Sequence, residues 1–298
     1  MEKAMFILNP SAGKELASTF KEETIKTLES MGYEVEVKET QGGGDATRFA
    51  RQACEESYDL VTAMGGDGTI NEAVNGIAEQ SHRPMFSFIP LGTVNDFARA
   101  LGISLDPHEA IESLKTAEPH YVDIAKAADK YFINILAIGQ VAESVSLVSV
   151  EQKTKLGTLA YLIEGFKALT SKDETKVFVK HDSGTWEGEA ILVLVALTNS
   201  VGGFEKLAPK AQMDDGLLHV FVLKSAGLPA LMRMGTAVLL GKLEEDPDVV
   251  MIKTERAHIK TNPKLSCNLD GDEASQTPID VQVLKKHVNV LIPLRNER

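Results

Sequence analysis

Apolar and polar positions follow different patterns in the two halves of the chain. In the first half, to about Ala117, short apolar runs rich in β-favouring residues are each followed by a segment with helical spacing. One such segment repeats Phe20, Ile25 and Leu28 at near-helical spacing before Gly32 ends it. Strands that alternate with helices in this way predict βαβ units around a parallel sheet. The expected strands are Met5–Leu8, Glu34–Lys38, Leu60–Met64 and Met85–Ile89.

In the second half, short β-favouring runs predominate, interrupted by two helical stretches, Leu156–Leu169 and Leu228–Leu243. Such a density of strands predicts a second domain that is mostly antiparallel sheet or β-sandwich. We expect the first domain to cover 1–125 and the second 126–287, with residues 288–298 belonging to either. The expected strands are Tyr121–Ile124, Tyr131–Ile138, Lys176–Lys180, Ala190–Leu197, Leu217–Leu223, Val249–Lys253, His258–Thr261, Ile279–Leu284 and Val288–Pro293.

Composition and charge narrow the class of protein. Of 298 residues, 43% are hydrophobic and 25% charged, which favours packed cores over disorder, and the net charge of −12 disfavours a nucleic-acid partner. No apolar stretch approaches the ~20 residues that span a bilayer, and we expect no export signal, because the apolar run Ala4–Leu8 is too short for its hydrophobic region. Cys54 and Cys267 lie far apart, without the spacing of a disulfide framework or a zinc site. We therefore expect a cytoplasmic protein whose membrane contact, if any, is peripheral.

The most informative segment is Gly65–Asn71, where the third expected strand ends in Gly-Gly-Asp-Gly-Thr-Ile-Asn. Glycines let phosphate oxygens approach the backbone, and the N–H groups at a helix N-terminus attract anions. Thr69 and Glu72 also fit a capping box, in which case the segment only makes a tight strand-to-helix turn. That alternative leaves Asp67 unexplained, because this carboxylate follows a parallel strand at the end where open α/β sheets bind ligands.

A second segment, Pro90–Asp96, repeats the pattern one βα unit later. Both segments contain Gly-Thr, then Ile or Val, then Asn and an acid, which is Glu72 in the first and Asp96 in the second. If the two segments were unrelated turns, their shared glycine, threonine, asparagine and acid would be a coincidence. We therefore expect the two helix starts, with Gly92 and Thr93 in the second, to face one crevice.

The glycine-containing segments do not match the best-known nucleotide-binding motifs. Gly13-Lys14 is followed by Glu15 and lacks the earlier glycine, so it is not a P-loop. The segment Gly66–Asn71 lacks the last glycine of the dinucleotide-binding fingerprint. The run Gly42–Gly44 predicts a flexible loop in which Asp45 caps a helix.

Two acidic turns stand out in the second half. Asp214–Gly216 enters a strand, and from its sequence it is equally a hairpin turn or a hard-cation site built from carboxylate and carbonyl oxygens. Asn268–Glu273 places three carboxylates in four residues, which suits a general base and also a plain exposed loop.

These residues together resemble the catalytic family of diacylglycerol kinases, which includes sphingosine and ceramide kinases and bacterial lipid kinases. The resemblance spans essentially the whole chain. It implies an α/β + β fold like that of NAD kinase and diacylglycerol kinase, with a Rossmann-like N-terminal domain, a C-terminal β-sandwich, and ATP with Mg²⁺ bound between them. It is carried by Asn9–Pro10 with Gly13, Gly65–Thr69 with Asn71–Glu72 and Asn75–Gly76, Pro90–Thr93 with Asn95–Arg99, and Asp214–Gly216.

The resemblance also implies roles for individual residues. Asp67 and Asp96 would hold the catalytic Mg²⁺. A structural Mg²⁺ would bind main-chain oxygens of Gln212 and Leu217 and the carboxylate of Asp215. The nucleotide would be lined by Asn9, Thr40, Gly65, Gly66, Asp67, Gly68, Thr69, Asn71, Glu72, Gly92 and Thr93.

The sequence departs from the family at the catalytic base. The family uses the acid of an Asp-Gly-Glu motif, whereas Asp270–Gly271 is followed here by Asp272, which is one methylene shorter, and then by Glu273. Either Asp272 reaches the substrate hydroxyl through a water, or Glu273 replaces it, or activity is low.

We therefore expect an ATP- and Mg²⁺-dependent kinase that phosphorylates the hydroxyl of diacylglycerol or a related lipid at the membrane surface. Two alternatives remain, namely a kinase of the NAD kinase type with a soluble substrate, and a catalytically silent nucleotide- or lipid-binding regulator. The sequence does not indicate which lipid is used, and it leaves a homodimer open. The catalytic candidates are Asp67, Asp96, Asp272 and Glu273.

Overall fold

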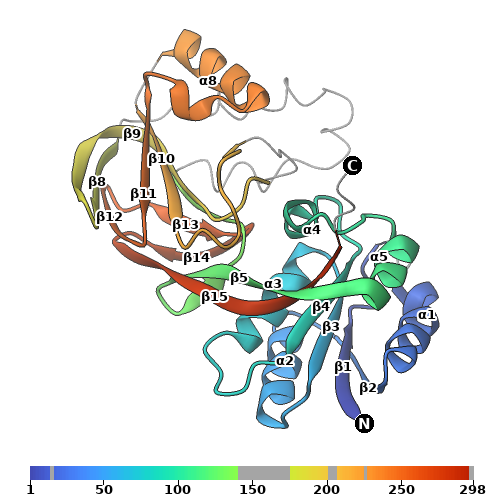
Figure 1. Ribbon diagram of the computed structural model, residues 1–298. Helices are drawn as coiled ribbons and strands as arrows, with labels where there is room; N and C mark the ends of the chain where they lie inside the picture. Colours follow the sequence, from blue (N-terminus) through green and yellow to red (C-terminus); the bar gives the residue numbers. More distant parts are fainter. Residues whose placement is uncertain (14–16, 140–174, 201–206, 225–226, 295–298) are drawn as a thin grey trace. The chain divides into compact units, whose positions relative to one another are not determined.

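The computed structural model describes residues 1–13, 17–139, 175–200, 207–224 and 227–294, which form two compact units (Figure 1). The first unit consists of Met1–Ile124 and Lys285–Arg298, and the second of Ala125–Leu284. The chain therefore leaves the first unit once and returns to it at its C-terminal end. The expected helix at Leu156–Leu169 lies outside the described residues.

The first unit contains a parallel sheet with the strand order β2-β1-β3-β4-β15, which confirms the predicted βαβ organisation. Strand β15 joins this sheet by pairing Val290 with Phe86 of β4. The elements of the first unit are β1 (Glu2–Leu8), α1 (Ala17–Ser30), β2 (Tyr33–Glu39), α2 (Asp45–Glu55), β3 (Leu60–Gly65), α3 (Asp67–Ile77), β4 (Met85–Pro90), α4 (Asp96–Leu101), α5 (Pro107–Ser113), the 3-10 turn η1 (Leu114–Thr116), β5 (Ala117–Ala127) and the end of β15 (Ile279–Pro293).

Helices cover both faces of this sheet. All six residues of β3 are buried, as expected for a parallel strand with helices on either side. Strands β2 and β3 lie on opposite sides of β1, so right-handed crossovers place α1 and α2 on opposite faces. Helix α3 packs against α2, and α5 packs against α1 (Figure 1).

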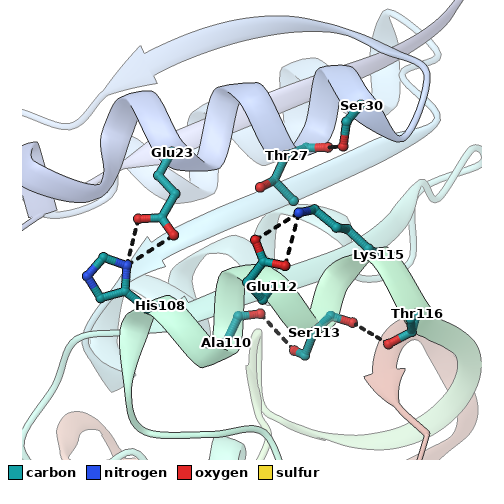
Figure 2. A network of polar contacts seen from close by, with 9 residues as sticks. All are labelled: Glu23, Thr27, Ser30, His108, Ala110, Glu112, Ser113, Lys115 and Thr116. Atoms are coloured by element: carbon teal, nitrogen blue, oxygen red, sulfur yellow. Dashed lines mark hydrogen bonds and ion pairs between the residues drawn. The ribbon is translucent and has the colours of Figure 1, made fainter.

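Polar contacts supplement the apolar packing between α1 and α5. Figure 2 shows His108 at the start of α5 directed at Glu23 of α1, with Nδ1 2.8 Å from Glu23 Oε2. The rings of His108 and Phe20 also pack edge to face, with centroids 4.8 Å apart. The buried face of α1 includes Thr24, whose hydroxyl donates to the Phe20 carbonyl at 2.9 Å and so needs no partner outside the helix.

The second unit is mostly antiparallel, which confirms the predicted β-sandwich class. Strand β9 is long: its first half pairs with β8, and its second half lies between β7 and β10. The elements are β6 (Lys130–Phe132), β7 (Ile135–Ile138), β8 (Thr175–His181), β9 (Gly184–Ala196), β10 (Leu218–Lys224), α8 (Leu228–Leu240), the 3-10 turn η2 (Leu243–Glu245), β11 (Val249–Thr254), β12 (Arg256–Asn262), β13 (Ser266–Leu269), β14 (Asp272–Gln276) and the start of β15.

Strand β10 separates two apolar cores of the second unit. Because side chains alternate along a strand, Val220 and Val222 enter the first core, while Phe221 and Leu223 enter the second. The second core is closed by α8, which contributes Leu231, Met234 and Val238. Among the helices of the described part, none is long and apolar enough to cross a membrane.

Several expected strands differ from those observed. Ile279–Leu284 and Val288–Pro293 are one strand, β15, in which Lys286 has a positive φ of 48°. Tyr131–Ile138 is divided into β6 and β7, because the chain bends between them. Strands β13 and β14 were not predicted, since their sequences, Ser-Cys-Asn-Leu and Asp-Glu-Ala-Ser-Gln, lack a strong β-favouring pattern.

The interaction of His108 with Glu23, between α5 and α1, should depend on pH. The hydrogen bond to Glu23 raises the pKa of His108 above its usual 6.5. The pair therefore stabilises the fold fully below the pKa of the unfolded chain, and this contribution is lost as the pH rises through the pKa of the folded state. We expect NMR titration to show the pKa of His108 falling in Glu23→Gln and staying unchanged in Glu22→Gln, which removes the same charge one position away. An equal response to both changes would contradict a specific pair.

Candidate active site

The carboxyl ends of β1 and β3 form the topological switch point of the first unit. The chain leaves β1 toward β2 on one side, and leaves β3 toward β4 on the other. Open α/β sheets bind ligands at such a point. Asn9, which follows β1, spans the gap, because its N–H donates to the Met64 carbonyl at 3.0 Å and its Nδ2 donates to Thr69 Oγ1 at 3.0 Å.

Asp67 joins the two glycine segments that the sequence singled out. It is the first residue of α3, and its Oδ2 and Oδ1 accept the N–H groups of Asn95 at 2.9 Å and of Asp96 at 3.0 Å. Burial, with a further contribution from the charge of Asp96, raises the pKa of Asp67 above its usual range. One carboxylate thus links the start of α3 to the turn that follows β4.

Glycine is required where the two segments touch. A Cβ on Gly92 would lie 2.6 Å from Asn95 Oδ1 and 3.1 Å from the Cα of Gly66, and a Cβ on Gly66 would lie 3.4 Å from the Cα of Gly92. The N–H of Leu91 also donates to the Gly65 carbonyl at 2.8 Å. The glycines therefore allow the two turns to approach each other, in addition to leaving backbone open to a ligand.

Asn95 belongs to this site although the sequence analysis gave it no role. It has a left-handed backbone (φ 54°, ψ 49°), its side chain is 4% exposed, and its Nδ2 donates to the Gly92 carbonyl at 2.8 Å. Its Oδ1 is buried without a hydrogen-bond partner among the described residues. The signal that could have found it is the asparagine shared by the two glycine segments, at Asn71 and Asn95.

The predicted capping box at the start of α3 is wrong. Gly66 occupies the N-cap position and no side chain caps the helix there. The carboxylate of Glu72 instead accepts the N–H groups of Gly44 at 2.9 Å and Ala46 at 3.2 Å, at the start of α2. A reciprocal capping box requires the acid to turn back on its own helix, and here the close packing of α2 and α3 offers it other free donors.

Asp45 is likewise not the N-cap of α2, which is Gly44 in a left-handed conformation. Its Oδ2 accepts the N–H groups of Gln41 at 2.8 Å and Gly42 at 3.1 Å. The carboxylate therefore closes the glycine loop that precedes the helix.

The remaining nucleotide-site candidates lie close to the same sheet edge. The N–H of Thr40, directly after β2, donates to the Leu8 carbonyl at 2.9 Å. Gly68 and Thr93 are exposed in the two glycine segments. Asn71 differs, because both its carbonyl and its side-chain Oδ1 accept from Asn75 Nδ2 at 2.9 Å within α3.

In the second unit, the carboxylate of Asp215 closes its own turn. It accepts the N–H of Leu217 at 2.9 Å and of Gln212 at 3.4 Å, and it lies 2.8 Å from Nε2 of the buried His219. Burial opposes ionisation, but these donors, above all His219, outweigh it and hold the pKa of Asp215 below its usual range. A cation would have to share the carboxylate with three donors, so the structural Mg²⁺ at Gln212, Asp215 and Leu217 stays a prediction.

The acidic segment Asn268–Glu273 comprises the end of β13, the turn Asp270–Gly271 and the start of β14. Asp272 and Glu273 are exposed in β14, and as neighbours in a strand they point to opposite faces. Glu273 Oε1 accepts the hydroxyl of Ser266 at 3.1 Å, whereas no partner of the Asp272 carboxylate occurs among the described residues.

Comparison with known proteins agrees with this two-part organisation. Residues 3–127 match the model of the diacylglycerol kinase catalytic domain, and residues 138–292 match that of the YegS C-terminal NAD kinase beta sandwich-like domain. A diacylglycerol kinase of Bacillus subtilis (strain 168) is 39% identical over 294 residues, which cover 98% of this chain and 97% of that protein. The chain belongs to the diacylglycerol kinase family.

Other members of the diacylglycerol kinase family show the same extent of similarity. A diacylglycerol kinase of Staphylococcus carnosus (strain TM300) is 37% identical over 292 residues, covering 98% of this chain and 95% of that protein. A crystal structure of a diacylglycerol kinase from Bacillus anthracis str. Sterne matches with a TM-score of 0.79 at 28% identity, covering 98% of this chain and 97% of that one. The resemblance inferred from the sequence, and the fold class that it implied, are confirmed.

The contact between the glycine segments can be tested by filling it. Overpacking a close contact usually costs about 1–3 kcal/mol of unfolding free energy. We expect Gly92→Ala to lose an amount in this range in urea unfolding, because its Cβ would collide with Asn95 and press on Gly66. The control is Gly42→Ala, where nothing lies within 4 Å of the added Cβ. Equal stability of the two variants would show that the segments are not in close contact.

Proposed function

We propose that this protein is a kinase that transfers the terminal phosphoryl group of ATP, with Mg²⁺, to the hydroxyl of diacylglycerol or a related lipid. One observation carries the proposal, namely that the Asp67 carboxylate binds the backbone N–H groups of Asn95 and Asp96. This contact gathers two glycine turns and two acids at the switch point of a parallel sheet. The relatives named diacylglycerol kinase support the lipid acceptor.

The triphosphate would bind at the glycine segments. Gly66 and Gly68 leave the backbone accessible at the start of α3, where free N–H groups and the positive end of the helix dipole favour phosphate oxygens. Asn9 and Thr69, already joined by a hydrogen bond, form the neighbouring wall at the end of β1. Phosphoryl transfer depends on such positioning and charge neutralisation more than on covalent chemistry.

Asp67 and Asp96 would hold the magnesium ion. The described residues contain no group of three or more His, Cys, Asp or Glu side chains suited to a metal ion. Two carboxylates would suffice for Mg²⁺ bound with its nucleotide, since Mg²⁺ commonly uses one or two carboxylates, water and substrate phosphates. When bound, the ion would neutralise charge on the transferring phosphoryl group. Oδ2 of Asp67 accepts the N–H of Asn95 and Oδ1 accepts that of Asp96, and a carboxylate oxygen has further lone-pair capacity that could bind the ion.

Asp272 is the better candidate for the base that accepts the lipid hydroxyl proton. Its carboxylate is exposed and has no hydrogen-bond partner among the described residues, whereas Glu273 is engaged by Ser266. A base has to be within hydrogen-bond reach of the hydroxyl, directly or through one water. The shorter Asp side chain is compatible with either arrangement.

Substitution of Asp67 tests the nucleotide site. We expect Asp67→Asn to lower turnover of diacylglycerol in mixed micelles by at least about 100-fold, because it removes charge from the centre of the phosphoryl-transfer site. Circular dichroism and thermal unfolding would confirm that the variant folds. Asp106→Asn, at the cap of α5, removes the same charge elsewhere in the first unit and should keep wild-type turnover. Turnover unchanged in Asp67→Asn would reject the assignment.

Parallel substitutions distinguish the two candidate bases. Loss of a general base typically costs about 10²- to 10⁴-fold in rate. We expect Asp272→Asn to lose turnover by a factor in this range. Glu273→Gln should change turnover by less than about threefold, well below that range. The opposite ranking would move the role to Glu273, and two unaffected variants would remove this turn from the mechanism.

A substrate panel separates the alternatives. Radiolabelled ATP would be supplied with diacylglycerol, a sphingoid base, ceramide and NAD under identical conditions. Labelling of NAD alone would favour a soluble-substrate kinase. ATP binding in calorimetry without labelling of any acceptor would favour a catalytically silent regulator.

A further inference from the structure

The turn between β13 and β14 is tied to a segment far away in the sequence. Asp270 and Gly271 have positive φ angles of 49° and 105°, as the two central residues of a tight hairpin turn do. The hairpin pairs Leu269 with Asp272, and the N–H of Gly271 donates to Asn268 Oδ1 at 2.9 Å. These contacts are local and would by themselves form the turn.

The carboxylate of Asp270 adds contacts that the hairpin does not need. Its Oδ2 accepts the N–H of Ile133 at 2.7 Å, and its Oδ1 accepts those of Asn134 at 3.0 Å and Ile135 at 2.7 Å. The N–H of Asp270 donates in return to the Ile135 carbonyl at 2.9 Å. Hydrogen bonds to a charged acceptor are stronger than neutral ones, so the turn is held firmly to the bend before β7.

We propose that Asp270 is a positioning residue that fixes the Asp272 carboxylate for proton transfer, an inference that rests on the proposed function. Asp272 follows the turn directly, so the backbone of Asp270 and Gly271 sets the place from which its side chain projects. The Asp272 carboxylate itself has no partner among the described residues that could hold it. Its position therefore depends on the anchored backbone, and a shift of about 1 Å at a reacting group can cost 100-fold in rate.

A purely structural role for Asp270 makes different predictions. The bend at Ile133 and Asn134 leaves backbone N–H groups outside the strand ladder, and Asp270 satisfies them. If this were its whole role, its loss would lower stability and affect turnover only through the fraction of folded protein. The proposal adds a loss of turnover in the folded protein that depends on Asp272.

Two variants remove the anchor and tolerate the backbone conformation. Asp270→Asn keeps an oxygen acceptor but places an amide group against an N–H donor, and Asp270→Gly removes the side chain at a position with positive φ. We expect both, assayed well below their melting temperatures, to lose about 10- to 100-fold in kcat. KM for ATP should stay within about twofold, because the backbone N–H groups that Asp270 accepts belong to Ile133, Asn134 and Ile135, which are not residues of the proposed nucleotide site.

Asp182 provides the matched control in the same unit. It lies in the turn between β8 and β9, and its Oδ2 accepts the hydroxyl of Thr254 at 2.8 Å and the N–H groups of Glu255 at 2.8 Å and Arg256 at 3.3 Å. No candidate site residue lies in that turn. We expect Asp182→Asn to lose stability on a similar scale while keeping kcat near the wild-type value.

A double-mutant cycle decides whether Asp270 acts through Asp272. If it does, Asp270→Gly should cost almost nothing further in the Asp272→Asn background, since the group that it positions is already absent. Losses that multiply independently, or Asp182 and Asp270 variants that lose kcat equally, would overturn the proposal. So would wild-type kcat in both Asp270 variants.

Hydrogen exchange separates this inference from the proposed function. The amides of Ile133, Asn134 and Ile135 should be protected in the wild type and exchange faster in Asp270→Gly, whether or not the assay contains the correct lipid. A wild-type protein that labels no lipid would reject the proposed function, and with it the catalytic role of the anchor. Unchanged exchange at these amides would reject the anchor itself.

Discussion

Two backbone N–H groups, those of Asn95 and Asp96, donate to the two oxygens of the Asp67 carboxylate, and the candidate site depends on this contact. It connects the start of α3 to the turn after β4, beyond the point where β3 and β4 pair in the sheet. The close approach of Gly66 and Gly92 accompanies it, since any larger residue at Gly92 would collide with Asn95. A partly buried carboxylate is costly to leave unpaired, so the contact constrains both turns at once.

The same device recurs in the second unit. Asp215, Asp182 and Asp270 each direct a carboxylate at the N–H groups of a turn or a bend. Aspartate suits this use because it is short, and because its two oxygens can accept several hydrogen bonds. Part of the net charge of −12 thus serves to fix loops. The acidic residues are therefore not only surface charges, because several of them hold turns in place through their carboxylates.

The acids proposed for chemistry differ from those that fix structure in one respect. Asp182 and Asp270 accept hydrogen bonds from distant segments and Asp215 from its own turn, whereas Asp272 has no partner among the described residues. Asp67 does both, because it holds the Asn95 turn and still has acceptor capacity. A carboxylate that accepts backbone N–H groups is held in place, while an unengaged one remains able to accept a proton or a metal ion.

The sequence by itself determined the periodic elements and the strand ends that carry glycine and acid, because apolar alternation and glycine are local signals. It therefore predicted the parallel sheet, the antiparallel second half and the place of Asp67 at the end of a parallel strand. Tertiary structure decided which groups meet: Glu72 caps α2 and not its own helix, Asp270 binds the bend at Ile133, and Asn95 lies at the centre of the site. Strands β13 and β14 were missed for the same reason, since their polar sequences become strands only through pairing with each other and with β7. A carboxylate has no preference in sequence for one backbone donor over another, and only the packed fold determines which donors are within reach.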